Sequence, residues 1–218
     1  MALAIFDLDN TLLNGDSDHA WGEFACDRGL VDADAFRALN DRFYQDYLEG
    51  RLDIDAYVRH ALTPVAGQAP ETVADWHRDF MTERIEPMFQ PRAFELVEQH
   101  RSAGDELLII TATSRFITEP IAARFDIGTL LACEGKMVDG RYTGEPEGIL
   151  TYAEGKVKSL EQWMSANGHT LAGSAFYSDS HNDIPLLEAV DRAVAVDPDD
   201  RLRAHAVERG WSIISLRD

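Results

Sequence analysis

The chain has 218 residues, of which 45% are hydrophobic and 27% are charged, values that are ordinary for a soluble globular protein. This length suffices for one large domain or for a core that carries a small insertion. The formal net charge is −19, which argues against a partner bound through a phosphate backbone, so we expect no nucleic-acid binding. A small phosphorylated metabolite held at one locally positive point is compatible with this charge.

The cysteines and the first residues bear on the cellular compartment. Cys26 and Cys133 are the only cysteines and lie far apart in the chain, which favours buried thiols in a reducing compartment and excludes a cysteine-rich metal motif. The amino terminus shows no basic segment and no long apolar core of a signal peptide. No apolar stretch reaches membrane-spanning length. We expect a soluble, cytoplasmic protein with no membrane partner, and the sequence leaves its oligomeric state open.

The apolar run at residues 3–6 predicts a short buried strand that is followed at once by Asp7 and Asp9. Side chains two residues apart on a strand share a face, so both carboxylates should project from its carboxyl end, where open α/β sheets bind ligands. Two close carboxylates repel each other unless a cation lies between them. The pair therefore predicts a metal-assisted reaction centre, and a strand that merely enters an acidic turn is the alternative.

Residues 14–90 carry only helical patterns. Aromatic and apolar side chains at helical spacing predict a helix that ends near Gly50, a short helix over residues 52–61, and a third around residues 73–80 with Pro70 near its first turn. We expect the aromatic stripes of these helices to lie in the core and not on a binding surface. This segment is predicted to be an α-helical cap domain inserted after the first strand.

Strands and helices alternate in the rest of the chain, which predicts a parallel sheet covered on both faces. The expected fold is therefore α/β, a three-layer, Rossmann-like core of residues 1–13 and 91–218 with the helical cap at residues 14–90. The predicted elements are a helix from Pro91 to Gly104, a strand at 107–111, a helix containing Pro120, a hairpin at 136–142 turning at Asp139-Gly140, a helix at 156–167, a strand at 175–178, a short helix from Pro185, a strand at 193–196, a helix at 202–209 and a strand at 212–216.

Polar residues follow two more predicted strands. Residues 111–114 offer amides and hydroxyls that suit a phosphate group, although a helix cap is the simpler reading of Thr113 or Ser114 alone. Asp179 and Asp183 lie four apart after the 175–178 strand, and Asp183 alone would be an ordinary helix cap. Lys156 could supply a point charge for a phosphate or for crowded carboxylates, or it could be an exposed lysine.

The order Asp-x-Asp, Thr, Lys and Asp-x-x-x-Asp, formed by Asp7, Asp9, Thr111, Lys156 and the 179/183 pair, resembles the motifs of the haloacid dehalogenase superfamily of phosphohydrolases. The resemblance spans the whole sequence, and the helical insertion after the first motif is similar to the cap of phosphoserine phosphatases and their relatives. The phosphatase branch is implied by Asp9, because dehalogenases lack an acid at this position.

The resemblance implies a covalent mechanism. Asp7 would attack phosphorus to form an aspartyl-phosphate, and Asp9 would protonate the leaving alkoxide and later deprotonate water. Thr111, Ala112 and Lys156 would hold the phosphoryl group, where charge stabilisation matters most.

The resemblance also implies a magnesium cofactor. Mg²⁺ takes hard oxygen ligands, which would come from Asp7, the Asp9 carbonyl and Asp179, with Asp183 in support.

The cap is expected to select the phosphate ester. Residues 14–90 hold 16 Asp or Glu against seven Arg and no Lys, which favours a cationic leaving group, although most of these charges suit solvated helix faces. Asp16 lies nine residues after Asp7, where phosphoserine phosphatases place a glutamate that meets the substrate amine. Arg59 falls on the arginine that grips the substrate carboxylate in those enzymes. Both residues are therefore predicted to bind substrate.

Two motifs depart from the phosphoserine phosphatase pattern. Residues 111–116 read Thr-Ala-Thr-Ser-Arg-Phe and residues 178–183 read Ser-Asp-Ser-His-Asn-Asp, which is more similar to a sister group with bacterial members that act on histidinol phosphate. That ester carries an amine and an imidazole but no carboxylate, so we expect it as the substrate and keep phosphoserine as the alternative. A non-catalytic metabolite-binding protein on the same fold is a third hypothesis, which the intact set of motif residues disfavours.

Overall fold

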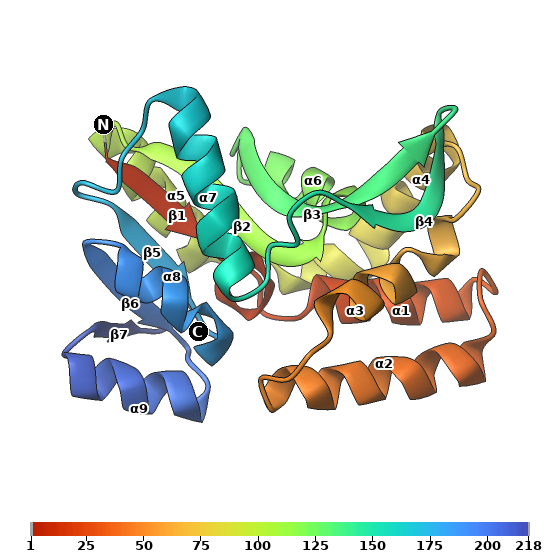
Figure 1. The fold of residues 1–218 in the computed structure, drawn as a ribbon, viewed down its shortest axis with the longest axis horizontal. Helices are drawn as coiled ribbons and strands as arrows, with labels where there is room; N and C mark the ends of the chain where they lie inside the picture. Colours follow the sequence, from red (N-terminus) through yellow and green to blue (C-terminus); the bar gives the residue numbers. More distant parts are fainter. Residues whose placement is uncertain (1, 218) are drawn as a thin grey trace.

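The computed structural model describes residues 2–217, which build a seven-stranded sheet with helices on both faces (Figure 1). The strand order is β4-β3-β2-β1-β5-β6-β7, and of the strand pairs only β3–β4 is antiparallel. This architecture confirms the predicted α/β, Rossmann-like fold. The strands are β1 (Leu3–Phe6), β2 (Glu106–Ser114), β3 (Thr129–Val138), β4 (Arg141–Glu147), β5 (Ala175–Ser178), β6 (Arg192–Val196) and β7 (Ser212–Ile214).

The named elements between residues 14 and 90 are all helical, as the sequence predicts. The division of the chain into a core and a cap stays a prediction. The helices are α1 (Ser17–Asp27), α2 (Ala33–Leu48), α3 (Ile54–Ala61), α4 (Pro70–Phe80), α5 (Pro91–Ala103), α6 (Arg115–Arg124), α7 (Glu154–Asn167), α8 (Ile184–Ala189) and α9 (Asp200–Arg209).

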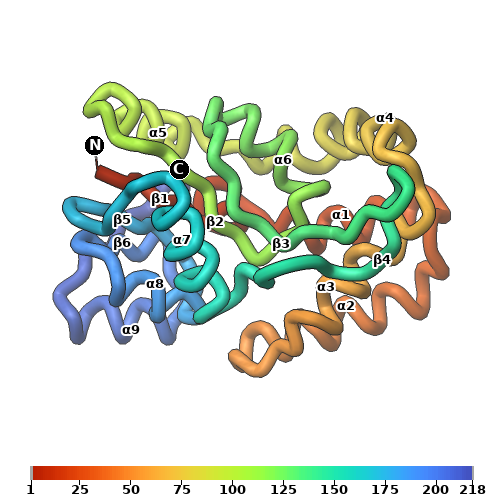
Figure 2. The backbone as a smooth tube through the Cα atoms, turned by 45° about the horizontal axis from the view of Figure 1, so that its top comes forward, coloured from red at the N-terminus to blue at the C-terminus, as the bar shows by residue number. Residues whose placement is uncertain are grey.

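The first strand shows why three layers form. Leu3 and Ile5 belong to one hydrophobic cluster with residues of α7, α8 and α9, whereas Ala4 and Phe6 belong to the other cluster, with residues of α5 and α6. Figure 2 shows α5 and α6 on one side of β1 and α8 and α9 on the other side. All four side chains are buried, and each large one contributes about 1.5–3 kcal/mol through the hydrophobic effect. An all-apolar strand is therefore stable only between two helical layers.

The helical segment is anchored to one of these layers. The hydrophobic cluster on the α5 and α6 face continues into α1, α3 and α4. The Trp21 ring of α1 lies 5.2 Å from the Phe80 ring of α4 and 5.4 Å from the Phe116 ring of α6, both edge to face. Edge-to-face contacts add to the burial of the rings, so the first turns of α1 are held firmly above the sheet.

Helix ends agree closely with the predictions. Pro91 begins α5, and Gly104, Gly168 and Gly210 end α5, α7 and α9 in the left-handed conformation that glycine adopts without steric cost. The hairpin turns at Asp139-Gly140, where φ is 49° and 72°, as the sequence predicts.

Three strand boundaries differ from the predictions. β2 continues to Ser114 and not only to residue 111, β3 begins at Thr129 and not in the hairpin near residue 136, and β7 ends at Ile214. The first part of β3 pairs in parallel with β2 and buries Leu130 and Ala132. The apolar run at residues 130–133 has only four residues, which is too short to show a clear period from which a strand could be predicted.

The topology places the site. β2 and β3 continue the sheet on one side of β1, whereas β5, β6 and β7 continue it on the other side. The carboxyl ends of β1, β2 and β5 therefore meet where the order reverses, which is the usual ligand crevice of an open parallel sheet. No helix among residues 2–217 combines the length and the apolar composition needed to cross a membrane.

Candidate active site

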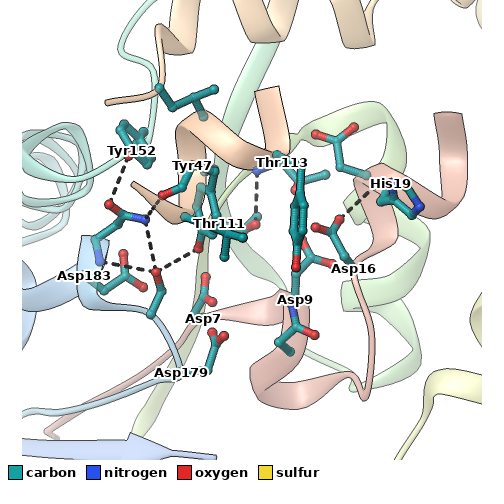
Figure 3. Close-up of a pocket in the computed structure, with 18 of the residues that line it drawn as sticks. Asp7, Asp9, Asp16, His19, Tyr47, Thr111, Thr113, Tyr152, Asp179 and Asp183 are labelled. Carbon is teal, nitrogen blue, oxygen red and sulfur yellow. Dashed lines mark hydrogen bonds between the residues drawn. The ribbon is translucent and has the colours of Figure 1, made fainter. Parts of the chain in front are cut away.

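A cavity of about 310 Å³ opens at the carboxyl ends of β1, β2 and β5, below α1, α2 and α3. Figure 3 shows Asp7 and Asp179 side by side at its base. The cavity brings together eight of the nine predicted site residues, namely Asp7, Asp9, Asp16, Thr111, Ala112, Lys156, Asp179 and Asp183. The ninth, Arg59, does not line it.

Lys156 lies on α7 between two carboxylates. Its Nζ donates hydrogen bonds of 2.7 Å to Asp7 Oδ1 and of 2.7 Å to Asp183 Oδ2, and the side chain is buried and not exposed. Burial alone would lower the pKa of Lys156, but the charges of Asp183 and Asp7 outweigh it and leave that pKa above its ordinary value. Lys156 is therefore a fixed positive charge beside Asp7.

Asp7 follows β1 directly and is 7% exposed. Burial raises the pKa of Asp7 to about 6, against the charge of Lys156, which lowers it. At neutral pH this carboxyl is mostly ionised and is directed by one strong donor, which suits a nucleophile.

Asp183 holds Lys156 in place. The oxygen that accepts from Lys156 also accepts from Ser178 Oγ at 2.7 Å. The Asp183 side chain forms no hydrogen bond to a backbone N–H at the start of α8, so it does not act as the helix cap that its position alone would favour.

Thr11 joins the carboxylates of Asp7 and Asp179. Its Oγ1 lies 3.4 Å from Asp7 Oδ2 and 3.1 Å from Asp179 Oδ1, and it also accepts from the Asp179 N–H at 3.0 Å. One hydroxyl hydrogen cannot serve both carboxylates. Burial, followed by the charges of Asp7 and Asp183, raises the pKa of Asp179 well above its ordinary value. The cluster thus carries more negative charge than its one lysine compensates.

This charge excess fits a divalent cation. The Asp7 and Asp179 carboxylates are hard oxygen donors of the kind that Mg²⁺ prefers, and Mg²⁺ commonly binds through one or two carboxylates while keeping several waters. Across residues 2–217, no set of three or more His, Cys, Asp or Glu side chains is arranged to hold a metal by itself. The donors present therefore match an ion that takes part of its shell from water or substrate.

Asp9 is held differently from Asp7. The Ser17 N–H at the start of α1 donates to its Oδ1 at 2.6 Å, and Thr113 Oγ1 donates to its Oδ2 at 2.8 Å. Burial and then the charge of Asp16 raise the pKa of Asp9 to about 8. Two carboxyls two residues apart thus have different partners, a lysine for Asp7 and neutral donors for Asp9, which is the pattern of a nucleophile paired with a general acid.

An irregularity in β2 presents the next group of residues. Ile110 pairs with Leu131 but Ser114 pairs with Cys133, so β2 holds two extra residues over this interval. Bulges of this kind turn the backbone beside active sites. Here the irregularity directs residues 111–113 into the cavity, and the Thr111 hydroxyl accepts from the Thr113 N–H at 3.2 Å.

The two residues of the helical segment 14–90 that are predicted to bind substrate lie in different places. Asp16 lines the cavity and begins α1, where its Oδ1 accepts from the His19 N–H at 2.9 Å. The Arg59 side chain is 44% exposed and pairs with Asp55 and Glu145. Only Asp16 is therefore placed to meet a substrate in this structure.

Other cavity residues were missed by sequence analysis. Phe43 and Tyr47 line the cavity, so the prediction that the aromatic stripe of this helix lies wholly in the core is wrong. The Tyr47 hydroxyl donates to Ser180 Oγ at 2.8 Å and thereby ties α2 to the loop after β5. For Thr113 the sequence leaves a phosphate contact and a helix cap open, and it does not predict the hydrogen bond to Asp9 on the neighbouring segment. Helical periodicity cannot separate a buried face from a cavity wall.

Comparisons with known proteins agree with this geometry. The haloacid dehalogenase-like hydrolase family model matches residues 4–188. A histidinol-phosphatase of Neisseria meningitidis serogroup C is 45% identical over 99% of both chains. A phosphoserine phosphatase of Mycobacterium tuberculosis is 32% identical over 99% of this chain and 71% of that protein.

Solved structures share the fold. A protein of unknown function from Bordetella pertussis superposes with a TM-score of 0.93 at 41% identity, covering 99% of both chains. A substrate-bound phosphoserine phosphatase superposes with a TM-score of 0.70 at 18% identity, covering 99% of this chain and 93% of that one. The chain belongs to the haloacid dehalogenase-like hydrolase family, as its motifs predict. Within that family it is a phosphatase, an enzyme that hydrolyses phosphate monoesters.

Proposed function

We propose that the protein is a Mg²⁺-dependent phosphatase that works through an aspartyl-phosphate on Asp7. The observation that carries this proposal is the contrast between neighbouring carboxyls. Asp7 accepts from Lys156 at 2.7 Å, whereas Asp9 accepts only from the neutral Ser17 N–H at 2.6 Å and Thr113 Oγ1 at 2.8 Å, and burial raises the pKa of Asp9. An ionised nucleophile beside a protonated acid is what a phosphate ester with an alkoxide leaving group requires.

Each residue then has a defined task. In the first step Asp7 attacks phosphorus, the bond from phosphorus to the leaving oxygen breaks, and Asp9 gives its proton to that oxygen. In the second step water attacks the aspartyl-phosphate, Asp9 takes a proton from this water, and Asp7 and phosphate are released. Lys156, the Thr111 hydroxyl and the backbone around Ala112 hold the phosphoryl oxygens, where charge stabilisation lowers the barrier most.

The metal would be held at the base of the cavity. Asp7, Asp179 and the Asp9 carbonyl are the proposed ligands of Mg²⁺, and Asp183 supports the site through Lys156. The bound ion would neutralise charge on the phosphoryl group.

The proposed substrate is histidinol phosphate. The support comes from the relative in Neisseria, named as a histidinol-phosphatase at 45% identity, and from the acidic surroundings of Asp16. Phosphoserine is the alternative, favoured by the relative in Mycobacterium. That substrate needs a cation for its carboxylate, and Arg59, the predicted candidate, is paired with Asp55 and lies outside the cavity.

Phosphate release tests the proposal. Wild type and Asp9→Asn are assayed on histidinol phosphate, phosphoserine and p-nitrophenyl phosphate, with Mg²⁺ or with EDTA. We expect Mg²⁺-dependent release with the highest kcat/KM on histidinol phosphate. The Asp9→Asn variant should lose least on p-nitrophenyl phosphate, whose leaving group needs no proton. No metal-dependent release from any ester would favour the non-catalytic binding protein, and a higher kcat/KM on phosphoserine would favour the alternative substrate.

A further inference from the structure

The wall of the cavity formed by α1, α2 and α3 is acidic and aromatic. Asp16 is the N-cap of α1 and Asp18 lies in its first turn. Phe43 and Tyr47 come from α2, and Tyr57 comes from α3. No Arg or Lys from these three helices lines the cavity. This wall therefore offers negative charge and aromatic faces to whatever part of a ligand reaches it, a combination that suits a flat cation.

Asp18 is the buried charge of this wall. Its side chain lines the cavity and is only 6% exposed, yet across residues 2–217 it forms no ion pair with a Lys, Arg or His. Burial and then the charge of Asp16 raise the pKa of Asp18 to about 7, which a hydrogen bond from Tyr57 partly offsets. A buried carboxylate without a cation is costly, so this position is prepared for a positive partner from outside the chain.

Asp18 also lies next to the point where the leaving group departs. The Ser17 N–H, between Asp16 and Asp18, donates to Asp9 at 2.6 Å. The charges of Asp18, Asp16 and Asp9 all help to raise the pKa of Tyr57, after burial. A leaving group that takes its proton from Asp9 therefore has its next atoms beside the first turn of α1.

The two candidate substrates differ at one substituent. Both carry an amine on the carbon next to the phosphorylated CH₂ group, and Asp16 could meet this amine in either case. The remaining substituent is a carboxylate in phosphoserine and an imidazolylmethyl group in histidinol phosphate. Imidazole has a pKa near 6.5 and is therefore readily protonated beside a carboxylate.

We propose that Asp18, supported by Tyr57, recognises the imidazolium of the leaving group and thereby selects histidinol phosphate over phosphoserine. The inference rests on the proposed phosphatase function. The same carboxylate would repel the carboxylate of phosphoserine. Arg59, the arginine that the phosphoserine phosphatase pattern assigns to that carboxylate, is bound to Asp55 at 2.6 Å instead and does not line the cavity.

The test compares wild type with Asp18→Asn, a change that removes the charge and keeps the shape. We expect the ratio of kcat/KM for histidinol phosphate to kcat/KM for phosphoserine to fall roughly 10- to 100-fold, the range of a lost charge-assisted hydrogen bond. Most of the change should be a higher KM for histidinol phosphate. Asp34→Asn, at an exposed position on α2, removes the same charge and should leave the ratio unchanged.

Two measurements separate a recognition role from a structural one. Thermal unfolding should show Asp18→Asn to be at least as stable as wild type, because the substitution removes an unpaired buried charge. Calorimetric titration with the alcohol histidinol should show weaker binding to Asp18→Asn by a similar factor. An unchanged ratio, or an equal loss on histidinol phosphate, phosphoserine and p-nitrophenyl phosphate, would overturn the proposal.

The outcomes also separate this inference from the proposed function. If the wild type releases phosphate from no ester, the phosphatase proposal is refuted. The titration with histidinol still tests whether Asp18 binds the imidazolium group. If the wild type hydrolyses esters and Asp18→Asn keeps the same selectivity, the phosphatase proposal stands and the role of Asp18 is refuted.

Discussion

Lys156 is the side chain on which Asp7, the proposed nucleophile, and Asp183 converge. Its ammonium bonds Asp7 and Asp183 at 2.7 Å each inside a buried site. In the proposed mechanism one residue serves both stability and chemistry, because the lysine that compensates the charge of Asp7 in the folded state would also hold the phosphoryl group.

Replacing Lys156 with alanine should therefore reduce both activity and stability. We expect phosphate release to fall about 10²–10³-fold, as for the loss of one charge-stabilising donor. The free energy of unfolding in urea should fall by up to about 3–5 kcal/mol, because two buried carboxylates lose their cation. Lys158→Ala, at an exposed position on the same helix, is the control, and equal effects of the two variants would contradict the role given to Lys156.

At this scale the sequence predicts residues that lie in motifs. The positions of Asp7, Asp9 and Asp179 beside strand ends could be predicted, because each residue directly follows a largely apolar run or lies two residues after such an aspartate. The contact of Thr113 with Asp9 and the role proposed for Asp18 beside Tyr57 could not be predicted, because the residues in each pair are distant in sequence. Asp18 was only one acidic residue among 16 in residues 14–90.

At the scale of elements, α4 carries a buried histidine with a consequence for pH. The His77 ring lies 5.3 Å from the Trp21 ring and stacks on the Phe116 ring at 5.9 Å. None of residues 2–217 provides a hydrogen-bond partner for its Nε2. Burial lowers the pKa of His77 to about 4. The folded protein thus keeps this ring neutral at pH values at which the unfolded chain is protonated.

The sign of the effect follows from proton binding. Between pH 6.5 and pH 4 the unfolded state binds more protons at His77 than the folded state, so stability falls as the pH falls. His77→Phe removes this contribution. Between pH 7 and pH 5 the free energy of unfolding of this variant should fall less than that of wild type, by about 2 kcal/mol. Urea unfolding at several pH values measures this difference. If the free energy of unfolding changes with pH equally in the two proteins, His77 is not buried as described.

Element boundaries were predictable where local chemistry sets them. Pro91, Gly104 and Gly168 start or end helices through backbone conformation alone, so the sequence suffices. The start of β3 at Thr129 and the irregularity in β2 depend on pairing between strands, which a single stretch of sequence does not contain.

For the whole molecule, the excess of buried negative charge predicts that Mg²⁺ stabilises the fold. A ligand that binds only the folded state at 100 times its Kd adds about 2.7 kcal/mol to the free energy of unfolding. For a chain of this size we expect Tm to rise by roughly 5–10 °C on saturation with Mg²⁺ and to return on addition of EDTA.

Asp179→Asn provides the matched test of that prediction. This variant should show little increase of Tm with Mg²⁺, since it lacks one of the two carboxylates proposed to bind the ion. Asp34→Asn should respond like wild type. A full increase in Asp179→Asn would place the metal elsewhere.

The overall architecture was the most predictable level. Alternation of apolar strands with helices determines a parallel sheet with two helical layers, and this requires no knowledge of side-chain contacts. The same reasoning could not show that α1 and α4 share a hydrophobic cluster with α6. The helical spacing of apolar residues in an inserted segment is the same whether that segment packs on the sheet or stands apart from it.

The central claim is that Asp7 carries the phosphoryl group, and trapping the intermediate tests it most directly. The enzyme is mixed with histidinol phosphate and Mg²⁺, quenched in acid within milliseconds to seconds, and digested for mass spectrometry. We predict one phosphoryl group on the peptide that contains Asp7 and none in Asp7→Asn, which should also lose at least about 10³-fold of phosphate release. Steady turnover with no phosphorylated peptide at any quench time, together with substantial activity of Asp7→Asn, would contradict the account.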